Sequence, residues 1–319
     1  MENIYHQIYN QIKISKNILL VTHDAPDGDV LASACLMIEL MESLAKPHIA
    51  YCYDEPPRQF NFLPHVEKII SDKNFNFAEF DLIIALDCGG INRTKLADEI
   101  SGRAKNQSVI DIDHHPKLDN YADLELGDPR AAATTEVLYN FLKANRIKIN
   151  KNIANCVLTG ILTDTANFLY PSTSQQTVEI ASEMLVKGAK MPQIMENTWR
   201  NKSLNSMKLW GKAMSRLKIN SEYNFGYSIL TLEEIAESGA DEEELEGIAG
   251  FISNLDNVKG IIFLREQPNG VVKGSLRTSR RDIDVSLLAR QLNGGGHAKA
   301  SGFKIEGRLE ETRSGWKII

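Results

Sequence analysis

The stretch from Asn17 to Asp29, NILLVTHDAPDGD, decides the fold of this chain. Its apolar run predicts a fully buried parallel strand near 17–23. Pro26 and Gly28 punctuate the loop that follows the strand, and the next residues, to about Ala45, are apolar nearly all round, as in a buried helix. A buried strand that feeds a buried helix is typical of the first unit of an α/β sheet.

The first half of the chain continues this alternation. Helices are expected near 133–145 and 150–163, and further strands near 48–53, 81–87 and 108–114. Strands that alternate with helices predict a doubly wound parallel sheet. The strand order stays open, because nothing in the pattern specifies it.

The second half divides into a helical stretch and a smaller α/β region. Residues 174–217 are helical in pattern, with breaks at Gly188 and Pro192. Strands near 225–231, 259–266 and 270–277, with helices near 241–253 and 284–292, predict a mixed sheet. We therefore expect an α/β domain at 1–185, a helical connector at 186–220 and a smaller α/β domain at 221–319.

Composition limits the classes of function. The 319 residues are 43% hydrophobic and 24% charged, as in an ordinary globular protein, and the net charge of −6 argues against a large basic surface for long duplex nucleic acid. Neither a membrane-spanning run nor a signal peptide is visible, so we expect a cytoplasmic protein without a membrane partner. The four cysteines are widely spaced and are expected to be buried free thiols. A homodimer stays open.

Acids and imidazoles follow the ends of several apolar runs. They are His23, Asp27, Asp29, Asp87, Asp113, His114, His115 and Asp164. Ligands of open α/β sheets bind outside the carboxyl ends of the strands, so these side chains are expected to converge there. Gathered carboxylates repel one another unless cations compensate them. A pair of divalent cations is the simplest answer, and it would lower the pKa of a shared water for attack on phosphorus.

Each of these residues also has an alternative interpretation. The Asp27-Gly28-Asp29 sequence is compatible with a solvated surface turn. Asp87 could accept hydrogen bonds from local N–H groups, and a single histidine could be a satisfied core residue. The combination of all these motifs in this order favours a metal site.

The chain resembles the DHH phosphoesterase superfamily, in its short two-domain nanoRNase/pAp phosphatase-like branch. The resemblance rests on His23-x-x-x-Asp27-x-Asp29, Asp87, Asp113-His114-His115, Thr163-Asp164 and Gly294-Gly-Gly-His297-x-x-Ala300-Ser-Gly302. It implies one manganese ion on His23, Asp27 and Asp87. The second would lie on Asp29, Asp87, His114 and Asp164, with Asp87 bridging. His115 would contact the substrate phosphate, and Asp113 would support it. Ala166 stands where the family commonly has glycine.

The resemblance also assigns substrate-binding residues. Consecutive glycines leave backbone N–H groups open to an anion, although such a run is more often a flexible turn. Arg277 offers a planar fork for phosphate, with an exposed strand arginine as the alternative. Arg93 matches a family arginine, and a solvated surface role is the alternative there. The expected set is Arg93, Arg277, Ser279, Gly294, Gly295, Gly296, His297 and Ser301.

The sequence therefore predicts a manganese-dependent phosphohydrolase of short oligonucleotides and 3′-phosphoadenosine 5′-phosphate (pAp). Mg²⁺ and Co²⁺ stay open as the metal. One alternative is a phosphodiesterase for cyclic or linear dinucleotides, and another is a nucleotide-binding sensor with slow turnover. A structural zinc site is disfavoured, because the candidate ligands are mostly acids and include no cysteine.

Overall fold

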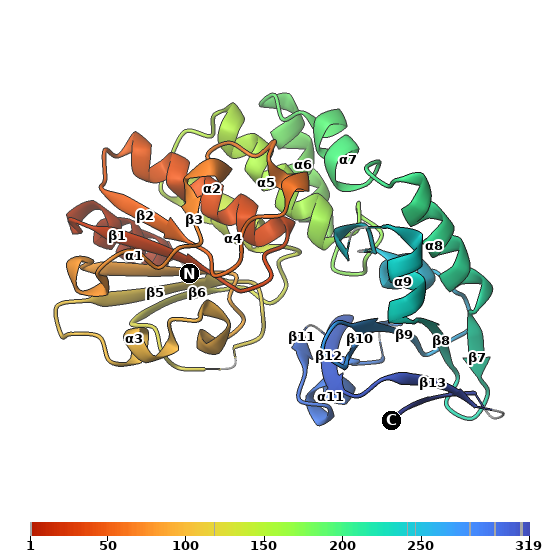
Figure 1. Cartoon of the computed structure of the whole chain (residues 1–319). Helices are drawn as coiled ribbons and strands as arrows, with labels where there is room; N and C mark the ends of the chain where they lie inside the picture. The colour runs from red at the N-terminus through yellow and green to blue at the C-terminus, as the bar shows by residue number, and fades with distance from the viewer. Residues whose placement is uncertain are drawn as a thin grey trace. The chain divides into compact units, whose positions relative to one another are not determined.

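The chain folds into two compact units, residues 1–200 and residues 201–319. The computed structural model (Figure 1) describes residues 2–117, 119–240, 242–245, 247–280, 282–296, 298–312 and 315–319. The predicted connector, 186–220, spans the boundary between the two units, and its separate role stays a prediction. Among the described residues, we find no helix with the length and apolar character that crossing a bilayer would require.

Unit 1 is built on a six-stranded parallel sheet, which confirms the predicted fold class. Its strands are β1 (Ile18–Thr22), β2 (His48–Tyr51), β3 (Ile69–Ile70), β4 (Leu82–Leu86), β5 (Ser108–Asp113) and β6 (Leu124–Gly127). Their order is β3-β2-β1-β4-β5-β6, and every neighbouring pair is parallel. The chain winds outward in opposite directions from β1 and β4, so the switch point lies between these two strands.

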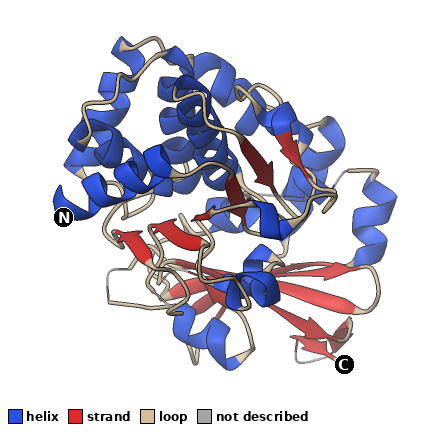
Figure 2. Ribbon diagram, turned by 90° about the vertical axis from the view of Figure 1, so that its left-hand side faces the viewer, coloured by secondary structure: helices blue, strands red, loops and turns tan. Residues whose placement is uncertain are grey.

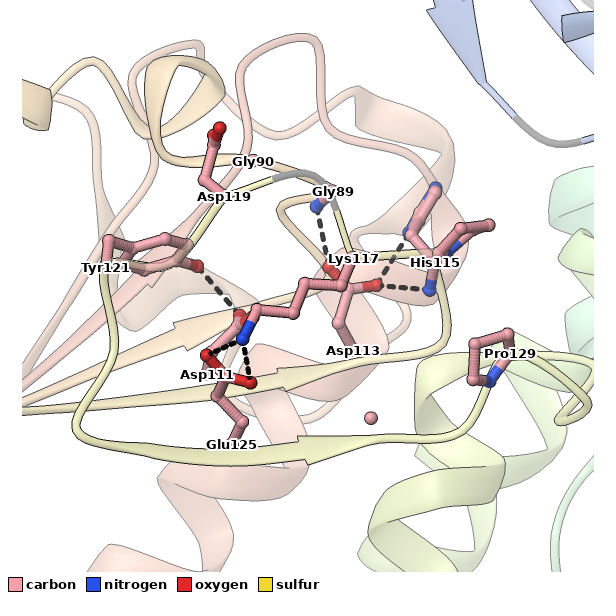
Figure 3. A pocket seen from close by; sticks show the side chains of 12 residues that line it. Gly89, Gly90, Asp111, Asp113, His115, Lys117, Asp119, Tyr121, Glu125 and Pro129 are labelled. Atoms are coloured by element: carbon pink, nitrogen blue, oxygen red, sulfur yellow. Dashed lines mark hydrogen bonds and ion pairs between the residues drawn. The ribbon is translucent and has the colours of Figure 1, made fainter.

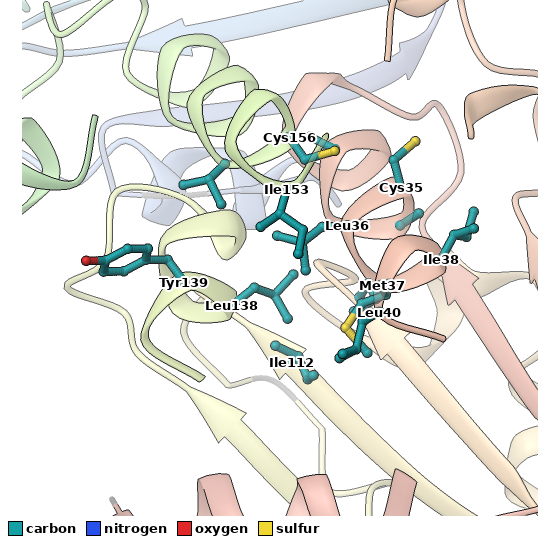
Figure 4. Close-up of a cluster of buried hydrophobic side chains, with 14 of the residues drawn as sticks. Cys35, Leu36, Met37, Ile38, Leu40, Ile112, Leu138, Tyr139, Ile153 and Cys156 are labelled. Carbon is teal, nitrogen blue, oxygen red and sulfur yellow. The ribbon is translucent and has the colours of Figure 1, made fainter. Parts of the chain in front are cut away.

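Helices of unit 1 cover the sheet on both faces. They are α1 (Glu2–Ile14), α2 (Gly28–Ser43), α3 (Ala97–Ser101), α4 (Thr134–Ala144), α5 (Lys151–Asp164), α6 (Gln175–Val186) and α7 (Met191–Thr198). Successive strand side chains point to opposite faces. Leu20 of β1 therefore packs in the core cluster that contains α2, α4 and α5, whereas Leu19 packs with Leu96 and Ile100 of the α3 region. Figure 4 shows the larger cluster around Leu36 and Leu138.

Unit 2 combines a mixed sheet with short helices, as predicted. Its helices are α8 (Leu204–Ser215), α9 (Leu232–Ser238), α10 (Ile248–Ile252) and α11 (Ser286–Gln291). Its strands are β7 (Lys218–Asn220), β8 (Phe225–Leu230), β9 (Gly260–Gln267), β10 (Val271–Arg277), β11 (Gly295–Gly296), β12 (Ala300–Glu306), β13 (Leu309–Thr312) and β14 (Gly315–Ile318). The main sheet has the order β11-β12-β10-β9-β8-β7. Its β8–β9 pair is parallel and its other pairs are antiparallel. Figure 2 distinguishes the helices and strands of the chain by colour.

The glycine-rich segment of unit 2 is part of this sheet. Gly295 and Gly296 in β11 pair with Gly302 and Ser301 in β12. A Cβ at Gly294 would lie 2.1 Å from the carbonyl oxygen of Gly302, so the backbones approach too closely for any other residue. The segment is therefore a tight antiparallel hairpin.

Candidate metal centre

The candidate ligands lie where neighbouring strands end. His23 directly follows β1, Asp87 directly follows β4, and His114 directly follows β5. These three strands are adjacent and parallel, so their carboxyl ends share one edge of the sheet. Asp87 has a left-handed backbone with φ of 58°, which turns the chain sharply at the end of its strand. Sequence positions that lie far apart thus meet at the switch point.

One group of donor atoms consists of His23, Asp27 and Asp87. The Nε2 atom of His23 lies 3.9 Å from a carboxylate oxygen of Asp27 and 3.9 Å from one of Asp87. The Nδ1 atom of His23 donates to the carbonyl oxygen of Asp24 at 2.6 Å. This hydrogen bond fixes the tautomer in which Nε2 has a lone pair directed at the two acids, as in a metal-ligating histidine.

A second group consists of Asp29, His114 and Asp164. The Nε2 atom of His114 lies 3.1 Å from Asp164 Oδ2 and 3.6 Å from Asp87 Oδ1. The Nδ1 atom of His114 donates to the carbonyl oxygen of Ala131 at 3.2 Å. Within each group, the potential ligand atoms lie within 4.8 Å of one another. Asp87 contributes to the first group and also reaches His114 of the second, so it lies between the two groups.

Two threonines that the sequence analysis did not single out hold these acids. Thr134 donates through its backbone N–H to Asp29 at 2.5 Å and through its hydroxyl to Asp87 at 2.8 Å. Thr135 donates to Asp29 through its N–H at 3.1 Å and its hydroxyl at 2.8 Å. Both residues begin α4, where backbone N–H groups favour an anion. In the sequence, the only feature that could have identified Thr134 and Thr135 is their position as a Thr-Thr pair at the start of a predicted helix.

His115 and Asp113 form a connected pair beside the metal groups. Asp113 Oδ1 accepts from the N–H of His115 at 2.7 Å and from its Nδ1 at 2.6 Å, and Oδ2 accepts from the N–H of Gly89 at 2.6 Å (Figure 3). A Cβ at Gly89 would lie 3.5 Å from the His115 ring and 3.7 Å from the Arg93 guanidinium. Gly89 therefore separates two cationic side chains, and the predicted residue Arg93 lies at the edge of the site.

The charges of this edge match the donor set of a divalent cation. Burial, followed by the charges of Asp87 and Asp164, raises the pKa of Asp29 well above its usual range. Burial also raises the pKa of Asp164 to about 6. Burial would raise the pKa of Asp87 as well, but His115, His114 and His23 together lower it. Acids that repel one another in this way, beside two oriented imidazoles, fit divalent cations.

The loop after Asp164 contains the departure from the family pattern. Ala166 has φ of 48°, and Asn167 and Phe168 are also left-handed, with φ of 60° and 68°. Glycine adopts this conformation without strain, whereas a Cβ makes it unfavourable. Ala166 therefore has the left-handed backbone conformation that suits glycine, and this residue is conformationally strained.

The remaining predicted residues belong to unit 2, and part of this set lies together. Arg277 ends β10 and donates from Nη1 to the carbonyl oxygens of Leu276 at 2.9 Å and Ser301 at 3.3 Å. Ser301 is buried, and Ser279 is exposed. The predicted residue His297 lies outside the described residues. The structure thus brings Arg277 and the glycine hairpin together within unit 2.

The chain matches two family models that together follow the division into units. The DHH family N-terminal domain matches residues 17–161, and the DHHA1 domain matches residues 223–314. The Bifunctional oligoribonuclease and PAP phosphatase NrnA of Thermus thermophilus is 30% identical over 91% of this chain and 84% of its own. The protein of that name from Bacillus subtilis is 24% identical over 94% of this chain and 92% of its own.

A solved structure agrees with these matches. The crystal structure of an exopolyphosphatase-related protein from Bacteroides fragilis has a TM-score of 0.87 and is 27% identical, and the match covers 98% of this chain and 93% of that one. The order of the two domains, the fold and the sequence identity over most of each chain all indicate the same family. The chain belongs to the DHH phosphoesterase family and is a hydrolase of phosphoester bonds.

Proposed function

We propose that the protein is a manganese-dependent phosphohydrolase that cleaves short oligonucleotides and removes phosphate from pAp. The observation that carries the proposal is the convergence of His23, Asp27, Asp29, Asp87, His114 and Asp164 on one edge of the sheet. Relatives that span nearly the same length are named oligoribonucleases and PAP phosphatases, which supports this choice of substrates. A cytoplasmic location stays a prediction.

The residues divide into two ligand sets. His23, Asp27 and Asp87 would hold one cation, and Asp29, His114 and Asp164 would hold the other, with Asp87 shared between them. Two bound cations supply a water of lowered pKa and neutralise charge on the phosphoryl oxygens. Carboxylate-rich sets of this kind suit Mn²⁺ or Mg²⁺ better than a structural zinc ion.

His115 and Arg93 would receive the phosphoryl oxygens. Burial would lower the pKa of His115, but its hydrogen bonds to Asp113 and Asp87 raise it to about 10. Asp113 fixes the ring through Nδ1, and in this proposal the ring donates to the substrate phosphate through Nε2. Together with the Arg93 guanidinium across Gly89, the ring would stabilise negative charge on the substrate.

A covalent intermediate on the chain is disfavoured. Cys88 directly follows Asp87, but it is fully buried, and burial raises the pKa of its thiol well above the usual range. A protonated, inaccessible thiol is a poor nucleophile. Direct attack by water is therefore the route that the side chains favour.

Unit 2 would bind the remote part of the substrate. Arg277, Ser279, Gly294, Gly295, Gly296, His297 and Ser301 are the proposed binding residues there. Arginine and glycine-flanked N–H groups are donors suited to a phosphate or a nucleotide end.

The experiment is a substrate panel with purified full-length protein. The panel contains an RNA dinucleotide, pAp, linear and cyclic di-nucleotides and pyrophosphate, each with Mn²⁺, Mg²⁺, Co²⁺ or EDTA. We expect Mn²⁺-dependent turnover of the RNA dinucleotide and pAp, which is lost in a folded Asp87→Asn variant. Binding without turnover of any substrate would favour a nucleotide sensor, and a preference for cyclic dinucleotides would overturn the proposed specificity.

A further inference from the structure

A pocket of about 280 Å³ opens beside His115, wholly within unit 1. Its floor and walls include Asp111, Lys117, Tyr121 and Glu125, and the Gly89–Gly90 backbone borders it near His115. In Figure 3, Tyr121 and Asp111 lie at one end and His115 at the other, with the Lys117 side chain between them. Among the described residues, none of the candidate metal ligands lines this pocket. The proposed reaction therefore does not assign it a part of the substrate.

We propose that this pocket holds the uncharged nucleoside that is attached to the scissile phosphate, with Asp111 accepting hydrogen bonds from it. This inference rests on the proposed function and adds a binding subsite to it. Sugar hydroxyls and base N–H groups both donate hydrogen bonds and have no negative charge, so either could bind to Asp111.

The end of the pocket formed by Tyr121 and Asp111 can accept hydrogen bonds. The Tyr121 hydroxyl donates to Asp111 Oδ1 at 2.8 Å, which fixes the carboxylate in place. A carboxylate accepts several hydrogen bonds, so Asp111 keeps capacity for donors on a ligand. Burial, followed by the charge of Asp113, raises the pKa of Asp111 to about 7, and new donors would relieve this unfavourable environment. A second phosphate in this position would meet repulsion from Asp111, Asp113 and Glu125.

The opposite end of the pocket has the hydrogen-bond donors that a phosphate requires. The His115 ring lines this end, and it and the Arg93 guanidinium, which lies outside the lining, approach the position of the missing Cβ of Gly89 at 3.5 and 3.7 Å. Lys117 is paired with Glu125 at 2.5 Å, so its charge is balanced within the pocket wall. The pocket thus changes from hydrogen-bond donating beside His115 to hydrogen-bond accepting at Asp111. A phosphate joined to a nucleoside has the matching change of polarity.

The test compares a nucleotide substrate with one that has no nucleoside. For the full-length protein with Mn²⁺, kcat/KM is measured on the dinucleotide ApA and on bis(p-nitrophenyl) phosphate. Asp111→Asn places an amide donor against the donors of the nucleoside, so we expect the ratio of the two kcat/KM values to fall about tenfold, as for one lost hydrogen bond to a charged group. Asp111→Ala removes the acceptor and should act in the same direction.

Asp98→Asn provides the matched control. Asp98 is an exposed acid on α3 outside the pocket, so this variant should keep the wild-type ratio. The deoxy-dinucleotide separates the two sources of donors: a persisting effect of Asp111→Asn assigns the contact to the base, and a vanishing effect assigns it to a sugar hydroxyl. Ratios within twofold of wild type in both folded Asp111 variants would overturn the subsite.

Binding of AMP, measured by calorimetry, separates this inference from the proposed function. If wild-type protein hydrolyses neither substrate, the proposed function fails, but the subsite still predicts that wild type binds AMP about tenfold more tightly than Asp111→Asn. Equal affinities, or no binding of AMP to wild type, would overturn it.

Discussion

Substituting Gly160 by alanine has two opposite effects. Alanine favours the helix more than glycine does, but its side chain would overlap with residues of the candidate metal centre. Gly160 lies inside α5, where alanine is ordinarily more stable by about 1 kcal/mol. Here the new Cβ would lie 2.1 Å from Asp29 Oδ1 and 2.2 Å from the Thr135 hydroxyl. Relieving this overlap moves Asp29 or α5, and overpacking of a close-packed region costs about 1–3 kcal/mol. The difference is a net loss of stability of up to about 2 kcal/mol.

The effect on activity should exceed the effect on stability. Displacing a positioned group by about 1 Å costs about a hundredfold in rate, so kcat should fall by about that factor. Urea denaturation, Mn²⁺ titration calorimetry and kcat would be measured on Gly160→Ala and on the control Gly211→Ala. Gly211 lies inside α8 with no atom within 4 Å of its Cβ position, so the control should be as stable as wild type or more stable. Wild-type stability and activity in Gly160→Ala would refute the reasoning.

Three further perturbations test separate parts of the chain. Thr134→Val removes the hydroxyl bound to Asp87 and should weaken Mn²⁺ affinity about 10–100-fold in a calorimetric titration, whereas Thr134→Ser should restore it. Ala166→Gly relieves a left-handed alanine and should stabilise the protein by up to about 1 kcal/mol in urea denaturation, so destabilisation would contradict the strain. Burial would raise the pKa of Glu234, but hydrogen bonds from Arg216 and Lys212 lower it to about 2. Its stabilisation is therefore complete above pH 4.5 and is lost as the pH falls toward 2. Glu234→Gln should lower stability at pH 7 by about 1–3 kcal/mol and flatten this acid limb in thermal melts; an unchanged limb would contradict the assignment.

The main sheet of unit 1 could be predicted because its strands are buried on both faces. Residues 18–21 and 82–86 are continuous apolar runs, and Val109, Ile110 and Ile112 form a shorter, interrupted one. Each is followed by acids or histidines, and the structure places β1, β4 and β5 there. Parallel strands share one carboxyl edge, so the convergence of the side chains that follow them could be anticipated as well. Strand order could not, because it depends on which helix covers which face.

The missed elements have weak local signals. The strand β3 is two residues long, and β6 (Leu124–Gly127) has one buried residue, Leu126, and no long apolar run. In unit 2, the pairing of Gly295 and Gly296 with β12 was missed because glycine is depleted in strands and typical of turns. The backbone approach that requires these glycines comes from the facing strand, which a local pattern does not contain.

The environment of Asp29 shows why the candidate metal ligands are visible in the sequence and the residues that support them are not. The candidate ligands are acids and histidines at the ends of strands and helices, so their chemistry identifies them. Asp29 is held instead by N–H groups at the start of α4 and by the space left at Gly160 of α5. A threonine at a helix start and a glycine within a helix each have ordinary local explanations. Their roles exist only once α2, α4 and α5 have packed together, so the supporting residues emerge from tertiary structure.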